Sequence, residues 1–145
     1  MSALKAALKT KLEADATLVA LLGTPAEGHT AAVYDSRAPE GAAAPYVIFQ
    51  KFDGEDKHTL GALSHVEEKF MVKGVCESPA DSVDGKPAED IHDRLGVVLG
   101  FDPTLTITGK TQLYTRRKRH LPDYEETKAD RVYTHRGAYY EIWTA

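Results

Sequence analysis

The segment VYTHRGAYYEIWT, residues 132–144, constrains the fold more than any other stretch of the chain. Its residues alternate as in a β-strand, in which successive side chains point to opposite faces. Apolar and aromatic residues occur on both faces: Val132, Ala138, Tyr140 and Ile142 on one, and Tyr133, Tyr139 and Trp143 on the other. A strand with two such faces is covered on both sides. We therefore expect one face to pack against helices of the same chain and the other against a neighbouring subunit.

Four further strands are expected from β-branched, aromatic or alternating residues. They lie at residues 32–37, 45–52, 66–76 and 105–113, and the last is expected to extend into the basic residues that follow it. The clearest signal is PYVIFQKF at residues 45–52. Residues 53–65 are expected to form a polar loop or hairpin tip, and residues 123–130 a long flexible loop.

Three helices are expected from apolar spacing and end signals. The first has leucines four residues apart and Ser2 as its N-cap, and the second begins after Asp15 and ends at Gly23. The third starts near Pro87 and ends at Gly100, with Ile91, Leu95, Val98 and Leu99 as its buried stripe. Within it, Asp90 and Arg94 have the spacing of an ion pair one turn apart.

The order of these segments predicts an α+β fold. We expect a mostly antiparallel sheet of four to five strands with two to three helices packed on one face. The chain of 145 residues has no internal repeat, low-complexity tract or domain boundary, so residues 1–145 are expected to form a single domain.

Composition favours an ordinary globular protein without a membrane segment. Hydrophobic residues make up 42% and charged residues 28%, and the formal net charge is −4, whereas duplex-DNA-binding domains are usually basic. The amino-terminal segment lacks the continuous apolar run of a secretory signal. The single cysteine, Cys76, excludes an intrachain disulfide and is expected to be a buried apolar residue. We expect the protein to be made in a cytoplasm and used or assembled there.

No pattern in the sequence predicts a catalytic, cofactor-binding or metal site. TGKT at residues 108–111 lacks the earlier glycine of a phosphate-binding loop, because position 104 is threonine. The six histidines form none of the pairs typical of metal sites. DGED at residues 53–56 lacks the spacing of a calcium loop. An enzyme is therefore not expected, and neither is a cofactor or a small-molecule substrate.

The basic run RRKR is the strongest local charge feature, and it consists of Arg116, Arg117, Lys118 and Arg119. In a regular strand, Arg117 and Arg119 would face one side and Arg116 and Lys118 the other. Three interpretations are open: a solvated strand end, ion pairs across a subunit boundary, or a nucleic-acid-binding patch in which Tyr114 and Tyr124 stack on bases. The candidate acidic partners are Asp53, Glu55, Asp56, Asp123, Glu125 and Glu126.

The order of the segments also resembles a known family. The residues that carry the resemblance are LVALLG at 18–23, VYDSRAPEGAAAPYVIFQKF at 33–52, Phe70 and Val72, AEDIHDRLGVVLG at 88–100 and GAYYEIWTA at 137–145. They span nearly the whole chain, and they are similar to the tail completion, or tail terminator, family of long-tailed bacteriophages and related gene-transfer particles. The match is one of order and spacing, and it contains no catalytic signature.

This resemblance implies a structural role. Members of the family form a ring, here expected to be a hexamer, on the head-proximal end of the tail tube, where it stops tube polymerisation and joins the tail to the head connector. The implied partners are other copies of the chain, the tail tube protein and a head–tail connector or neck protein, and DNA passes through the lumen without being read. The implied location is the virion tail, after assembly in the host bacterial cytoplasm. A neighbouring head–tail connector or neck protein is the alternative.

A closed ring needs two unlike surface patches that meet. The basic run and the acidic candidates would supply such patches and set register and partner choice. Tyr139 and Trp143 are expected to supply most of the affinity.

Overall fold

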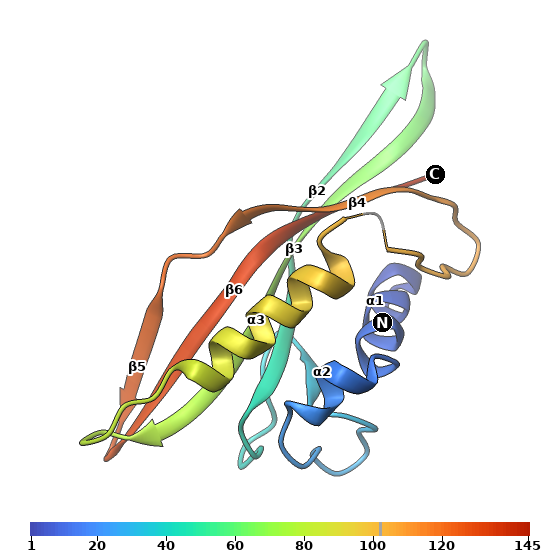
Figure 1. Ribbon diagram of the computed structural model, residues 1–145. Coiled ribbons are helices and arrows are strands. Elements are labelled where there is room, and N and C mark those ends of the chain that lie inside the picture. Colours follow the sequence, from blue (N-terminus) through green and yellow to red (C-terminus); the bar gives the residue numbers. More distant parts are fainter. Residues whose placement is uncertain (102) are drawn as a thin grey trace.

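The computed structural model describes residues 1–101 and 103–145. The described residues form three helices and six strands (Figure 1). In chain order these are α1 (Ala3–Glu13), α2 (Ala16–Ala20), β1 (Val33–Asp35), β2 (Tyr46–Thr59), β3 (Ala62–Pro79), α3 (Lys86–Leu99), β4 (Gln112–His120), β5 (Tyr124–Lys128) and β6 (Arg131–Thr144).

The strands belong to one sheet with the order β1-β2-β3-β6-β4. β5 also pairs with β6, beyond the part of β6 that β4 covers. β1 and β2 are parallel, and all other pairs are antiparallel. The expected α+β class is therefore confirmed, and the sheet has one strand more than the largest number expected.

All three helices pack against the same face of the sheet and enclose the core. α3 runs across β3 and β6, while α1 and α2 cover the part of the sheet near β1 (Figure 1). Gly74 of β3 allows α3 to come close, because a Cβ atom placed there would lie 2.5 Å from Cγ2 of Ile91. Leu8, Leu12, Phe49 and Ile91 are completely buried in this layer.

The first two helices begin at the caps predicted from the sequence, but one predicted ion pair is not formed. The Ser2 side chain accepts a hydrogen bond from the Lys5 backbone N–H, and Asp15 accepts one from Leu18. The predicted Asp90–Arg94 pair is wrong. Arg94 instead donates two hydrogen bonds, of 3.0 and 2.8 Å, to the Asp15 carboxylate, and the arginine therefore ties α3 to the start of α2.

Asp90 has a different partner, since it accepts from Lys86 one turn earlier at 2.9 Å. The hydrogen-bonded Arg94 guanidinium lowers the pKa of Asp15.

The strand predicted at residues 105–113 is wrong before Gln112, where β4 begins, but its expected extension into the basic run is confirmed. The residues before it form an irregular segment with a turn at Gly109, whose φ of 74° favours glycine. The side chain of Gln112 anchors this segment by accepting from the Leu105 N–H and donating to the Pro103 carbonyl. Leu105 and Ile107 are buried in the core. Their alternation therefore reflects burial in a loop that the Gln112 side chain anchors, and not a strand.

Residues 53–65 form the hairpin tip that was one of the two expected alternatives, whereas residues 123–130 contain a strand where a loop was expected. β2 and β3 continue through residues 53–65 and form a hairpin whose turn lies at Leu60 and Gly61, both with positive φ. We call residues 53–66 the hairpin arm, and it projects well beyond the helices (Figure 1). Residues 124–128 of the second predicted loop form β5. Long-range pairing therefore orders two segments whose composition is polar.

Candidate functional site

The sheet face opposite the helices carries half-buried aromatic and charged side chains. We call it the open face. In β6 it presents the odd-numbered residues Tyr133, His135, Tyr139, Glu141 and Trp143, while the even-numbered Ala138, Tyr140 and Ile142 lie in the helix-covered core. The predicted division of the last strand into two faces is confirmed, and helices cover one of them. Whether a neighbouring subunit covers the other remains a prediction.

A β-bulge at Lys118 changes the predicted arrangement of the basic run. Arg116 lies opposite Glu141, Arg117 opposite Tyr140 and Arg119 opposite Tyr139, and the register shifts between Arg117 and Arg119. Since directly opposite residues share a face, Arg116 and Arg119 both lie on the open face. The expected grouping of Arg117 with Arg119 is therefore wrong.

Arg117 belongs to the helix-covered side. Its Nη1 atom would lie only 2.5 Å from a Cβ atom placed on Gly96 of α3, so the guanidinium rests against the helix backbone. Its backbone N–H donates to the Gly100 carbonyl at 3.0 Å. The four cations therefore do not present one continuous basic ribbon to a phosphate backbone.

One cluster on the open face is built around Trp143. The ring of Tyr114 lies 4.9 Å from it and that of His65 stacks at 5.0 Å, and Trp143 Nε1 donates to Glu141 Oε1 at 2.5 Å. Arg116 lies 5.0 Å over the Tyr114 ring and donates to the Tyr114 hydroxyl. A cation and three rings are thus held in one layer, an arrangement typical of interaction surfaces.

A second cluster surrounds Tyr139. Phe52 packs on this ring at 4.6 Å and Arg119 lies over it at 5.1 Å. Together with Lys69 and Lys118 these residues line a hollow of about 360 Å³. Phe52 is 50% exposed, so the cluster offers apolar surface to a partner. Phe52 was missed in the sequence, and Tyr114 was considered only as a base-stacking residue, because the packing of both depends on cross-strand register.

The six acidic candidates lie in two separate places. Asp53, Glu55 and Asp56 are on the hairpin arm, where Asp53 contacts Lys69 at 3.7 Å and Glu55 contacts Lys57 at 2.7 Å. Within the described part of the chain, no carboxylate lies within ion-pair distance of Arg116, Arg117, Lys118 or Arg119.

The other three candidates lie around β5, at the opposite end of the sheet. Asp123 contacts Arg136 at 3.3 Å and Glu126 contacts Lys128 at 3.2 Å, while Glu125 is exposed. The Glu126 pKa is lowered mainly by its hydrogen bond with Lys128. The structure therefore brings together neither the two acidic groups nor either group with the basic run.

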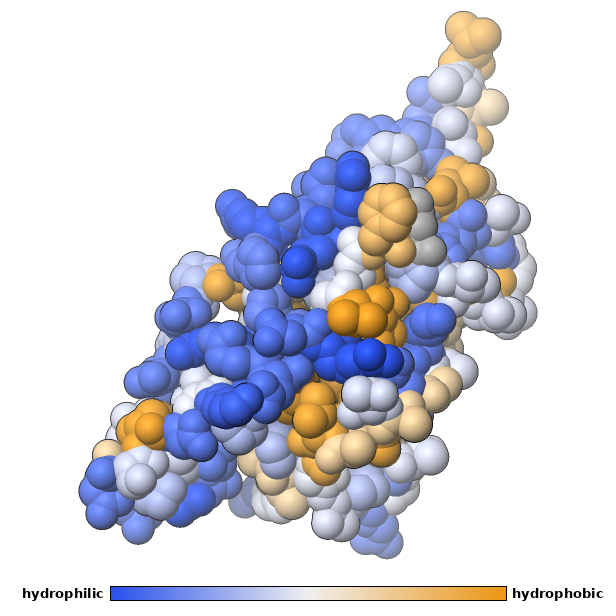
Figure 2. Space-filling model, in the orientation of Figure 1, coloured by the Kyte–Doolittle hydropathy of each residue, from blue (hydrophilic) through white to orange (hydrophobic). Residues whose placement is uncertain are grey.

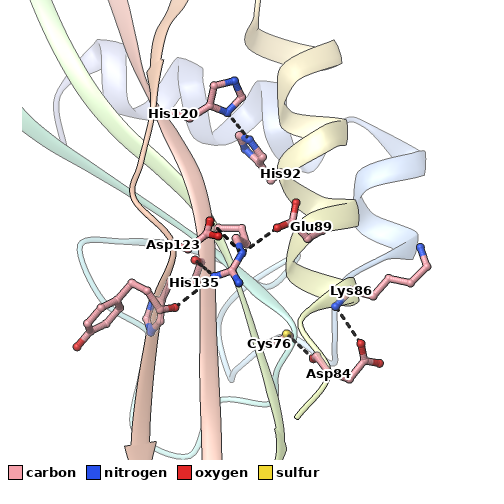
Figure 3. Close-up of polar contacts among 10 residues, drawn as sticks. Cys76, Asp84, Lys86, Glu89, His92, His120, Asp123 and His135 are labelled. Carbon is pink, nitrogen blue, oxygen red and sulfur yellow. Dashed lines mark hydrogen bonds and ion pairs between the residues drawn. The ribbon is translucent and has the colours of Figure 1, made fainter.

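Figure 3 shows a polar layer between α3 and the outer strands that sequence analysis did not predict. His92 and His120 are joined by a 2.8 Å hydrogen bond, which requires at least one neutral ring. Burial lowers the His92 pKa, and the neighbouring His120 and Arg117 add to this effect. Arg136 contacts Glu89 at 2.8 Å as well as Asp123. These contacts hold α3 against β4 and β6.

Cys76 is buried, as expected, and its thiol donates to the Asp84 carbonyl at 3.5 Å. Burial raises its pKa, which is unfavourable for a reactive thiolate. Among residues 1–101 and 103–145, no group of three or more histidine, cysteine, aspartate or glutamate side chains is arranged to hold a metal ion. In the same residues, no helix has the length and apolar character needed to cross a membrane.

No protein-family model matches the chain, and no curated protein matches its sequence. Among solved structures, a chain of the virion of a native gene transfer agent particle matches with a TM-score of 0.71 and 22% identity, over 97% of this chain and 94% of that chain. A second solved structure matches with a TM-score of 0.57 and 16% identity, over 97% of this chain and 93% of that one. At these identities the likeness shows a shared fold.

Proposed function

We propose that this chain is a structural virion protein of the tail terminator type. In this role, six copies form a ring on the head-proximal end of a phage-like tail tube, stop its polymerisation and join it to the head connector. The partners are other copies of the chain, the tube protein and the connector or neck protein. DNA passes through the lumen without being read. The protein is assembled in a bacterial cytoplasm and ends in the virion tail.

The shared fold with a chain of the gene transfer agent virion carries this proposal. It covers almost the full length of both chains, so the relation includes the hairpin arm and the outer strands as well as the core. The sequence segments quoted above, from residues 18–23 to residues 137–145, support the same family independently of the structure.

The surface chemistry supports a role in assembly. The open face offers Tyr139, with Arg119 over its ring, and Trp143 packed on Tyr114, and on this face the β2 and β4 edges carry unlike charges. Unlike patches favour a heterologous contact, which closes into a ring when the rotation between copies allows it. The basic run and the acidic candidates are the proposed contact residues, and no catalytic group or cofactor enters the function.

Tube length in a strain lacking the gene tests this proposal. Loss of a terminator yields overlong tubes, because nothing stops polymerisation, and expression of the wild-type chain restores normal length. Electron microscopy of purified particles measures the length distribution. Tubes of normal length that fail to join heads would contradict the terminator role and favour a neck protein.

A further inference from the structure

On the open face, the part of β2 beyond β1 and the β4 edge carry opposite charges. β1 covers β2 only as far as Phe49, and the β2 edge beyond it presents Asp53 and Glu55 on the open face. β4, at the other edge, presents Arg116 and Arg119 on the same face. β3 and β6 lie between these edges, so a single copy cannot bring them together.

The register of the sheet places these charges in a common row. Asp53 lies opposite Lys69, Lys69 opposite Glu141, and Glu141 opposite Arg116. The four side chains therefore cross the open face with alternating negative and positive charge. The row begins with a carboxylate at the β2 edge and ends with a guanidinium at the β4 edge. A second copy placed beside β4 continues the alternation when its Asp53 follows Arg116.

The next row of paired residues, one step closer to the tip of the arm, also crosses the open face from a carboxylate on the β2 edge to the β4 edge. It runs from Glu55 through Glu67 and Trp143 to Tyr114, and the Tyr114 hydroxyl accepts a hydrogen bond from Arg116. Arg116 therefore ends the first row on the β4 edge and is also bonded to Tyr114, which ends the second. Asp53 is paired with Lys69 and Glu55 with Lys57 at exposed positions, and such ion pairs exchange partners at little cost.

A contact between the β4 edge of one copy and the β2 edge of the next would be made by side chains, because the backbone ladder of β4 cannot continue at Arg116 and Arg117. The β4 edge is occupied at Arg116 and Arg117 by a bridge from Phe101 and the hydrogen bond to Gly100. Phe101 is 78% exposed and adds apolar surface beside the cations. The apolar outer end of the arm, with Leu60 and Leu63 exposed, extends past this contact (Figure 2).

We infer that neighbouring copies of this chain associate head to tail, with Asp53 and Glu55 of one copy facing Arg116 of the next and with Arg119 in the adjacent row, on the side away from the tip of the arm. This inference rests on the ring of the proposed function and specifies which surfaces form it. Because the contact lies at exposed positions, it is weakened by salt.

Two charge-reversed variants of the full chain test the inference. One carries Asp53→Lys and Glu55→Lys, so that both edges are basic, and the other carries Arg116→Glu and Arg119→Glu, so that both are acidic. All four residues are exposed in the single copy, so each variant is expected to fold. A control chain carries Glu27→Lys and Lys86→Glu, at exposed positions outside the sheet. Native mass spectrometry and circular dichroism report assembly and folding.

Each reversed variant alone is expected to have a dissociation constant for assembly at least about tenfold above the wild-type value. An equimolar mixture is expected to restore rings of alternating variants, because every contact then joins opposite charges, and the control chain assembles as the wild type does. The edge contact is overturned if each reversed variant alone still forms rings. It is also overturned if the mixture stays dissociated while the wild type assembles. Either result leaves the proposed ring intact. A wild-type chain that stays monomeric both free and with tail tubes overturns the ring itself.

Discussion

His135 shows how burial on the open face sets the charge of a single residue. Its ring lies 4.9 Å from Tyr124, and within the described chain neither ring nitrogen has a hydrogen-bond partner. Burial, with a smaller contribution from the Lys73 ammonium, lowers its pKa from 6.5 to about 4. The folded state therefore holds a neutral imidazole at neutral pH.

This pKa predicts acid sensitivity. The unfolded chain binds a proton at His135 near pH 6.5, whereas the folded chain resists it until about pH 4, so the free energy of unfolding falls as the pH drops through this window. At roughly 1.4 kcal/mol per pKa unit, discounted for partial exposure, the loss attributable to His135 is about 2 kcal/mol. Urea unfolding at pH 7 and pH 4.5 measures it.

The variant His135→Phe keeps an aromatic ring but cannot titrate, so it should lose less stability than the wild type over the same pH change. His58→Gln, on the exposed hairpin arm, is the control and should keep the wild-type dependence. Equal losses in wild type and His135→Phe would show that this residue does not account for the acid sensitivity.

At the scale of elements, the bulge in β4 decides which cations face a partner. Lys118 is the extra residue, and the strand pairs regularly with β6 on both sides of it through Arg117 and Arg119. A regular strand without Lys118 would therefore still place Arg116 and Arg119 on the open face and Arg117 toward α3.

Deletion of Lys118 is accordingly expected to be tolerated. We expect a loss of less than about 1 kcal/mol, or no more than about 4 °C in the thermal midpoint, and retained assembly. Deletion of Thr115, which is buried and accepts a hydrogen bond from the Gln112 side chain, is the contrasting variant and should impair folding because it also moves Tyr114 to the opposite face. A Lys118 deletion that unfolds the chain would mean that the bulge itself is required for the strand.

The sequence predicts helices here better than strand pairing. Leucine spacing and the Ser2 and Asp15 caps act within a few residues, so both helix starts could be read directly. The pairing that orders the hairpin arm and β5 is long-range and leaves no signal in polar residues. The alternation of Leu105 and Ile107 was misleading, because core contacts bury both residues in a loop that the Gln112 side chain anchors.

The candidate site was predictable only in part for the same reason. The basic run, the aromatic residues of the last strand and the acidic residues were identified from composition. Their arrangement depends on the bulge and on cross-strand register, neither of which is encoded in RRKR alone. The row from Asp53 to Arg116 therefore becomes visible only in the folded sheet.

At the scale of the whole molecule, one layer of helices leaves the other sheet face and both sheet edges for assembly. The three helices and the enclosed core stabilise the single copy, while the hairpin arm projects where no helix supports it (Figure 1). The open face and the oppositely charged edges are separate from this core. Assembly can therefore be disrupted by surface substitutions that leave the fold intact.

Native mass spectrometry of the wild-type chain at near-physiological salt, with and without purified tail tubes, tests the central claim most directly. The account predicts a species of six chains, each of 15.9 kDa, either free or recovered from the tube ends. A ladder of smaller assemblies that ends at six chains would agree with the same ring. A mass of one chain at every concentration, with no protein bound to the tubes, would contradict it.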